Sequence, residues 1–135
     1  MRKVNPAAVF AALSMLTAVR PSLAHHSFMA EFDQRKPLTV TGIVTKIEWQ
    51  NPHAFFYLDA KNETGAVVKW SFQTATPIAL INRGWKRGDV KVGDRITVQG
   101  YLSKHGSNYA AARSVLMPDG HKIFTGSMDD GGPDR

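Results

Sequence analysis

The sequence predicts an all-β domain, and three observations lead to this prediction. Across residues 38–125, segments rich in β-branched and aromatic residues alternate with clusters of turn-forming residues. A helix-start signal, threonine followed by proline, comes after the third such segment. Glycines lie within the first and fourth segments, where the strands of a small barrel must bend sharply. The order of elements predicts a small five- to six-stranded OB-like Greek-key barrel with one short helix between strands 3 and 4, although another small open barrel or a sandwich would give a similar pattern.

The first two predicted strands span residues 38–50 and 53–61. The first strand contains Gly42, and its apolar positions change face along its length, which together predict a bulge. An asparagine and a proline separate the two strands. Alternation in the second strand places Phe55 and Tyr57 on the face opposite the core.

A hairpin turn at residues 62–65 leads to a third predicted strand at residues 66–74. Thr76 then has the character of an N-cap, and Pro77 fits the first position of a short helix. The apolar side expected for this helix consists of Ile78, Leu80 and Ile81.

The remaining predicted strands are separated by glycine-containing turns. The fourth covers most of residues 92–104 and contains Gly100, the fifth spans residues 109–117, and a short sixth spans residues 122–125. Residues 126–135 are rich in glycine and aspartate and poor in apolar side chains, so we expect a disordered tail after the barrel.

The first 24 residues have the pattern of an export signal. Arg2 and Lys3 precede an apolar run over residues 7–19, and Ser22-Leu23-Ala24 provides small residues where a signal peptidase cuts. The run is shorter than the ~20 residues that a membrane span needs. We therefore predict a Sec-type signal peptide over residues 1–24, cleaved after Ala24, and a periplasmic or secreted product without a stable membrane span.

Residues 25–37 form the predicted N-terminal arm between the signal and the barrel. Phe28 and Phe32 are spaced to share one face of a helical turn, so we expect them to pack the arm against the barrel.

Composition and motifs exclude several classes of function. The chain has no cysteine, which removes disulfides, thiolate metal sites and cysteine nucleophiles. Three basic residues of the formal +6 net charge lie in the signal, and the rest are scattered, so we do not expect nucleic acid as a partner. No nucleophile elbow, phosphate loop or dinucleotide fingerprint is present, so we predict that the protein is not an enzyme.

Several short motifs, taken together, resemble a family of small exported bacterial proteins classed as a domain of unknown function. The motifs are HHSF followed by FD, IEWQNPH, RGW, and VGD followed by GY. The positions that carry the resemblance most closely are His25, His26, Phe28, Phe32, Asp33, Asn51, Pro52 and His53. The resemblance implies a fold and no established activity.

Cleavage after Ala24 would leave His25 as the first residue, so that a free backbone amine and an imidazole would belong to one residue. One further imidazole would complete a three-nitrogen site, an arrangement that suits copper. His53 is the first candidate for this third ligand because it opens the second strand, and His26 is the alternative because it is adjacent in sequence. The sequence thus predicts a metal site, with copper as the expected ion and a carrier or accessory role.

A second hypothesis is a binding module without a metal. OB-like barrels bind ligands through strands 2 and 3, and here that outer face offers Phe55, Tyr57, Trp49 and Lys69. The partner would be an unknown periplasmic protein or a small ligand. Burial of Phe55 and Tyr57 beneath the N-terminal arm is the structural alternative.

Overall fold

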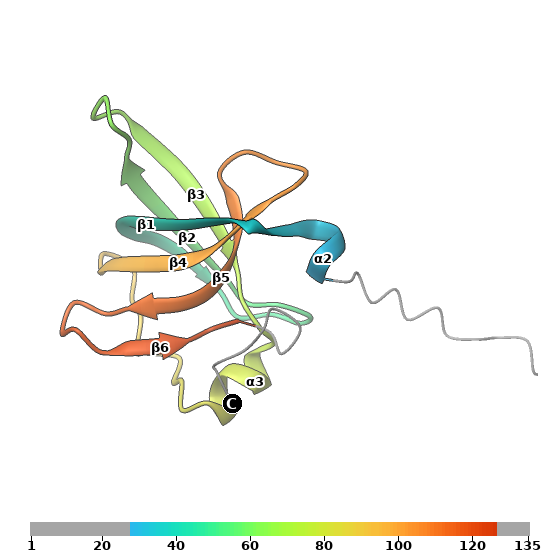
Figure 1. Cartoon of the computed structure of the whole chain (residues 1–135). Helices are drawn as coiled ribbons and strands as arrows, with labels where there is room; N and C mark the ends of the chain where they lie inside the picture. Colours follow the sequence, from blue (N-terminus) through green and yellow to red (C-terminus); the bar gives the residue numbers. More distant parts are fainter. Residues whose placement is uncertain (1–27, 127–135) are drawn as a thin grey trace, which may run out of the picture.

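The computed structural model describes residues 28–126, which form one curved sheet with two short helices (Figure 1). The strands are β1 (Phe32–Glu48), β2 (Phe55–Lys61), β3 (Val67–Gln73), β4 (Arg95–Ser103), β5 (Tyr109–Leu116) and β6 (Lys122–Phe124). The helices are α2 (Phe28–Glu31) and α3 (Pro77–Asn82). The predicted signal residues 1–24, the first three residues of the predicted arm and residues 127–135 of the predicted tail lie outside the described range.

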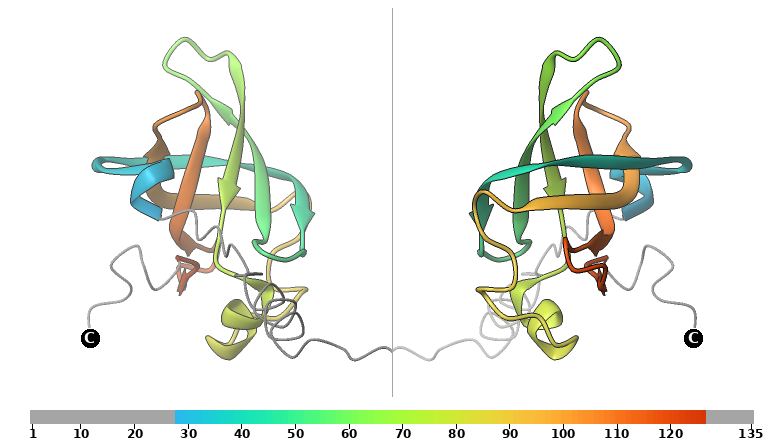
Figure 2. Two further views of the ribbon diagram at one scale, coloured as in Figure 1. Left: turned by 90° about the vertical axis from the view of Figure 1, so that its right-hand side faces the viewer. Right: turned by 90° about the vertical axis from the view of Figure 1, so that its left-hand side faces the viewer.

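The strands close into a ring in the order β1-β2-β3-β5-β4 and back to β1. All neighbours in the ring are antiparallel except β3 and β5, which pair in parallel over three residues, and β6 extends the free part of the β5 edge. Figure 2 shows the strands curving around a common interior, with α3 beyond one end and the β2–β3 turn beyond the other. The predicted all-β class, with a short helix between the third and fourth strands, is confirmed.

Strand β1 is long and bent, because its first half pairs with β4 and its second half with β2. The pairing register shifts between Val44 and Lys46, which confirms the predicted bulge. A side chain at Gly42 would place its Cβ 2.7 Å from a carbonyl oxygen of β2, and one at Gly100 would lie 1.9 Å from the carbonyl oxygen of Ala111. Both glycines are needed because the crossing backbones leave no space for a side chain.

The core lies inside the ring and continues toward α3. Trp85, in the loop after α3, is buried and stacks on Phe56 with ring centroids 5.4 Å apart. The largest fully buried side chains are Trp85, Phe32, Phe56, Phe72, Leu58, Leu80, Ile96, Val44, Val98, Val115, Thr74 and Thr125.

Helix α3 begins where the sequence predicts, and one of its three large apolar side chains is buried in the core. The hydroxyl of Thr76 accepts a hydrogen bond from the backbone N–H of Ala79 at 3.2 Å, which confirms the N-cap. Leu80 is fully buried, whereas Ile78 and Ile81 are 62% and 49% exposed. Of the three residues expected on the apolar side of this helix, only Leu80 reaches the core, because a helix of this length points only one of them there.

The predicted arm is more regular than expected. Residues Phe28–Glu31 form a helical turn, and β1 begins at Phe32 rather than at residue 38. Phe32 pairs with Ser103 and Pro37 pairs with Tyr101, with an irregular stretch between them. That irregularity removes the alternation by which a strand is recognised in sequence. Within residues 28–126, neither helix is long and apolar enough to cross a membrane.

Candidate functional site

The loop between β4 and β5 holds the carbonyl groups of α2. The backbone N–H of Lys104 donates to the carbonyl oxygen of Glu31 at 2.9 Å. The ammonium group of Lys104 donates to the carbonyl of Met29, and Nε2 of His105 lies 3.2 Å from the carbonyl oxygen of Ala30. These groups satisfy carbonyls that a short helix leaves unpaired at its C-terminal end.

Aromatic packing forms a second attachment of the same segment. Phe28 and Phe32 lie with ring centroids 5.1 Å apart. Phe32 is 1% exposed and contacts Tyr109 edge to face at 5.4 Å, while Phe28 contacts Tyr101 at 6.2 Å. The two phenylalanines therefore pack the segment against the barrel, as their spacing predicts, on β4 and β5.

Tyr109 links α2 to β3 through its hydroxyl group. The phenol oxygen lies 2.7 Å from Oε1 of Glu31 and 2.6 Å from Oε1 of Gln73. Burial raises the pKa of Tyr109, and the hydrogen bond with Glu31 adds to that effect. The phenol is therefore neutral at physiological pH. It connects the N-terminal segment to the end of β3, next to the residue that bonds His53.

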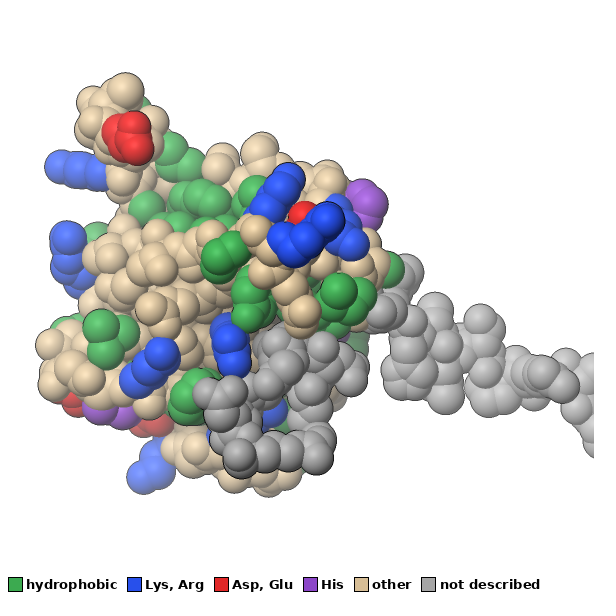
Figure 3. All heavy atoms as spheres, in the orientation of Figure 1, with side chains coloured by type: hydrophobic (Ala, Val, Ile, Leu, Met, Phe, Trp, Pro, Cys, Tyr) green, Lys and Arg blue, Asp and Glu red, His purple; other side chains and the backbone are tan. Residues whose placement is uncertain are grey.

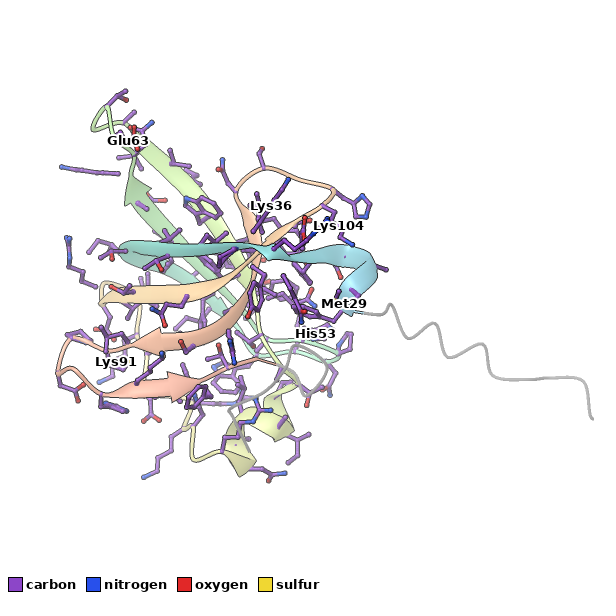
Figure 4. All side chains as sticks on the ribbon, viewed as in Figure 1. Met29, Lys36, His53, Glu63, Lys91 and Lys104 are labelled. Atoms are coloured by element: carbon purple, nitrogen blue, oxygen red, sulfur yellow. The ribbon has the colours of Figure 1, made fainter. Side chains whose placement is uncertain are left out.

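His53 is held at the start of β2 by the backbone that follows β3. Its Nδ1 lies 2.9 Å from the carbonyl oxygen of Thr74, the residue directly after Gln73. Backbone hydrogen bonds between Ala54 and residues Thr74 and Ala75 fix both chains there. Nε2 of His53 has no hydrogen-bond partner within residues 28–126. Figure 4 shows His53 and Met29 on the same side of the barrel, where the described chain begins.

The hydrogen bond to Thr74 fixes a tautomer of His53 that leaves Nε2 able to bind a metal ion. Nδ1 can act only as the donor toward a carbonyl oxygen, so the lone pair of a neutral His53 ring lies on Nε2. The residues before Phe28 include the other two predicted ligands, His25 and His26, which lie outside the described residues. Between residues 28 and 126, no three histidine, aspartate or glutamate side chains are grouped to hold a metal ion by themselves.

Phe55 and Tyr57 form a partly exposed stack on the outer face of β2. Their ring centroids are 6.4 Å apart with planes at 26°. The hydroxyl of Tyr57 donates to Glu48 at 2.7 Å, and the ammonium group of Lys46 lies 5.2 Å from the Tyr57 ring. The ion pair with Lys46, aided by Tyr57, lowers the pKa of Glu48. The N-terminal segment stacks on Tyr101 and Tyr109, so its described ring contacts do not cover Phe55 and Tyr57.

The other two residues predicted for this face lie outside the Phe55–Tyr57 stack. Trp49 packs edge to face on buried Trp85 at 6.5 Å, with the guanidinium of Arg87 5.8 Å from its ring. Lys69 is exposed and pairs with Asp59 at 3.2 Å. The structure therefore brings Phe55 and Tyr57 together and leaves Trp49 out of their stack.

Asp33, one of the motif residues, has a local structural role. Its carboxylate accepts hydrogen bonds from the backbone N–H of Arg35 at 3.1 Å and from Nε of the same residue at 3.0 Å. These bonds hold the pKa of Asp33 below its usual value. Because the carboxylate is used within two residues, it supports the irregular start of β1.

The sequence did not reveal the roles of Tyr109, Lys104 and His105. His105 is exposed, yet its ring contacts α2. These residues are far from α2 in the sequence, and no local pattern couples them to it. Only the ring closure of the sheet brings the β4–β5 loop to the N-terminal segment.

Comparison with curated proteins finds no match to this sequence. A family model described as a family of unknown function, DUF6152, matches residues 12–112. The match covers most of the chain and confirms the resemblance to a domain of unknown function that the motifs predict. The chain therefore belongs to the DUF6152 family.

Proposed function

We propose that this protein is exported, is cleaved after Ala24, and binds copper through the terminal amine and ring of His25 together with a third nitrogen from His53. The observation that carries the proposal is the state of His53, whose Nδ1 is occupied by the carbonyl of Thr74 while Nε2 has no described partner. The role that fits this small domain is that of a copper carrier or accessory protein rather than an enzyme.

The hydrogen bond between Nδ1 of His53 and the carbonyl of Thr74 favours a ligand role. Metal-binding histidines usually donate their other ring N–H to a carbonyl or carboxylate, which fixes the ring and the tautomer. Thr74 supplies such a carbonyl, and its own backbone is fixed because the residue is buried and bonded to Ala54. The ring is thus oriented before any metal arrives, which lowers the entropy cost of binding.

The fixed position of α2 sets how far the predicted ligands can reach. His25 precedes Phe28 by three residues, a span of about 10 Å when extended. Phe28 is held by rings of β1 and β4, and Glu31 is linked through Tyr109 to β3, next to the residue that holds His53. The arm therefore starts from an anchored point on the side of the barrel that carries His53.

Copper fits the available donors better than a hard cation does. An amine and two imidazoles are nitrogen ligands that suit Cu(II), and no thiolate is present in the chain. The side chain of Met29 is 50% exposed and could supply a soft thioether to Cu(I). His26 remains the competing third ligand, and in that case the site would lie wholly within the arm.

The amine requirement gives a direct test. We would compare the processed protein, with His25 first, against a variant with one additional glycine before His25, by Cu(II) titration and EPR. We expect the additional residue to change the Cu(II) EPR spectrum, since it removes the amine and ring chelate of His25 and moves the free amine onto the glycine. Equal affinity and identical spectra would contradict the proposal.

One observation favours the second candidate, a ligand- or protein-binding module. The Phe55–Tyr57 stack is partly exposed, and no described ring of the N-terminal segment covers it. Aromatic side chains of this kind dominate binding surfaces. If the stack is a binding surface, replacing both residues by alanine removes a crosslinked periplasmic partner, while Ile43→Ala on neighbouring β1 retains it. An identical set of crosslinked proteins for both variants would contradict this candidate.

A further inference from the structure

A groove lies at the end of the barrel opposite α3, beneath the projecting β2–β3 turn. Its volume is about 580 Å³, and its walls come from β1, β2, β3 and the β4–β5 loop. Figures 1 and 4 show the hairpin that carries Glu63 extending past the closed ring, and Figure 3 shows hydrophobic side chains on the surface beneath it. The groove is lined by residues distinct from His53, Phe55 and Tyr57.

The floor of the groove is apolar because the core is open at this end. Val68 and Trp70 point to the same side of β3 as fully buried Phe72, and Val40 joins them from β1. Strand β3 pairs with β2 along its whole length but with β5 only from Ser71 onward, so the edge of its first half that faces β5 has no described strand beside it. Trp70 stacks on Phe72 at 5.7 Å and keeps part of its surface in the groove.

The rim carries uncharged polar side chains with free hydrogen-bonding groups. The side chains of Thr39 and Asn108 make no hydrogen bond to any residue between 28 and 126. Asn62 uses its Oδ1 to accept bonds within the hairpin turn, which leaves its amide NH₂ without a described partner. The charged rim residues, Lys61 and Glu63, have opposite signs, so the groove has no preference for an ion.

We propose that this groove binds a short neutral carbohydrate, with one sugar ring stacked on Trp70 and its hydroxyl groups bonded to Thr39, Asn62 and Asn108. A sugar ring has an apolar face of C–H groups and an edge of hydroxyls, which matches an aromatic floor with a neutral polar rim. The volume lies within the range of about 300–1,000 Å³ that is usual for ligand sites. This binding is independent of copper and of the N-terminal residues.

The test uses the indole N–H signals of the three tryptophans in ¹H–¹⁵N spectra of the whole protein in the presence of EDTA. The probes are three neutral oligosaccharides, maltotetraose, cellotetraose and tetra-N-acetylchitotetraose, each titrated into the millimolar range. We expect at least one of them to move the Trp70 signal to saturation, while the signals of Trp49 and Trp85, which pack together near α3, stay in place. No movement of the Trp70 signal with any of the three probes would overturn the proposal.

Two substitutions then test the polar rim without altering the core. Thr39→Val keeps the shape and removes the hydroxyl, and Asn108→Gly removes the amide while tolerating the positive φ of 57° at that position. Each should weaken sugar binding by about three- to tenfold through the loss of a hydrogen bond. Ser107→Ala, an exposed neighbour outside the groove, is the matched control. Affinities equal to that control would overturn the proposed contacts, and an unchanged affinity in His53→Gln would separate this site from the copper site.

Discussion

Two parts of the chain extend beyond the closed ring of strands, and they are held in opposite ways. The N-terminal segment, residues 28–36, places Phe32 in the core and gives three carbonyls of α2 to the β4–β5 loop. The tip of the β2–β3 hairpin, residues 60–67, makes its described polar contacts within its own turn, through Asn62. The N-terminal segment can position ligands because it is bonded to the barrel. The β2–β3 hairpin is bonded mainly to itself, and it projects over an open groove.

The largest expected difference between the two regions is the loss of unfolding free energy when an apolar side chain is truncated, because the two regions bury different amounts of apolar area. Phe32→Ala should lower the free energy of unfolding by about 3–5 kcal/mol, because it empties a buried ring site. Val67→Ala, at a position 60% exposed in the hairpin, should change it by less than about 0.5 kcal/mol. Urea unfolding followed by tryptophan fluorescence measures both, and a cost below about 1 kcal/mol for Phe32→Ala would show that the segment is not part of the core.

A smaller loss of stability is expected when the hydrogen bonds of Tyr109 to the N-terminal segment and β3 are removed. Tyr109→Phe removes the contacts to Glu31 and Gln73 and should cost about 1–3 kcal/mol, because it leaves partly buried groups unpaired. The matched substitution in the hairpin, Asn62→Ala, should remove hydrogen bonds only within the β2–β3 turn. Hydrogen exchange should show faster exchange at α2 for the first variant and at residues 64–66 for the second. Exchange at α2 that is the same in wild type and Tyr109→Phe would argue against the link.

Because of Tyr109, the stability of the folded protein should depend on pH in the alkaline range. The pKa of Tyr109 is raised above its ordinary value of 10.0, so the folded protein keeps the neutral phenol after the unfolded chain has begun to ionise. Its contribution to stability is therefore complete below about pH 10 and declines as the pH rises further. Wild type should lose more stability than Tyr109→Phe between about pH 9 and pH 11. Parallel losses in the two proteins would mean that the phenol is not the responsible group.

The smallest effect is expected for the surface ion pair on the hairpin strands. Lys69 is 83% exposed at its side chain and pairs with Asp59 at 3.2 Å. Lys69→Gln should change the free energy of unfolding by less than about 0.5 kcal/mol, and added salt should remove the difference. A cost above about 1 kcal/mol that persists in high salt would show that the hairpin is more tightly integrated than its exposure suggests.

The parts of the fold that the sequence predicted depend on local signals. The change of apolar face in the first strand predicted the bulge next to Val44, and Thr76-Pro77 predicted the start of α3. The start of β1 could not be predicted, because residues 33–36 are irregular and the pairing of Phe32 with Ser103 is remote in sequence.

The candidate site was predictable only in part. His53 was identified from its place between two strands, but its bond to Thr74 depends on the β2–β3 register, which the sequence did not reveal. Trp49 was predicted to join the outer face of strands 2 and 3, whereas its ring packs on Trp85, a contact between the end of β1 and the loop after α3 that no local pattern indicates. The open end of the barrel at Trp70 could not be predicted, because it depends on how far β3 pairs with β5.

The central claim is that the anchored N-terminal segment and His53 hold one copper ion together. Pulsed EPR of the Cu(II)-loaded, processed protein, compared with His53→Gln, tests it most directly, with His121→Gln as the control because that exposed ring pairs only with Asp119 among the described residues. We predict that His53→Gln loses one imidazole from the nitrogen couplings and binds Cu(II) at least about tenfold more weakly, while the control matches wild type. The same couplings and affinity in His53→Gln and wild type would contradict the claim.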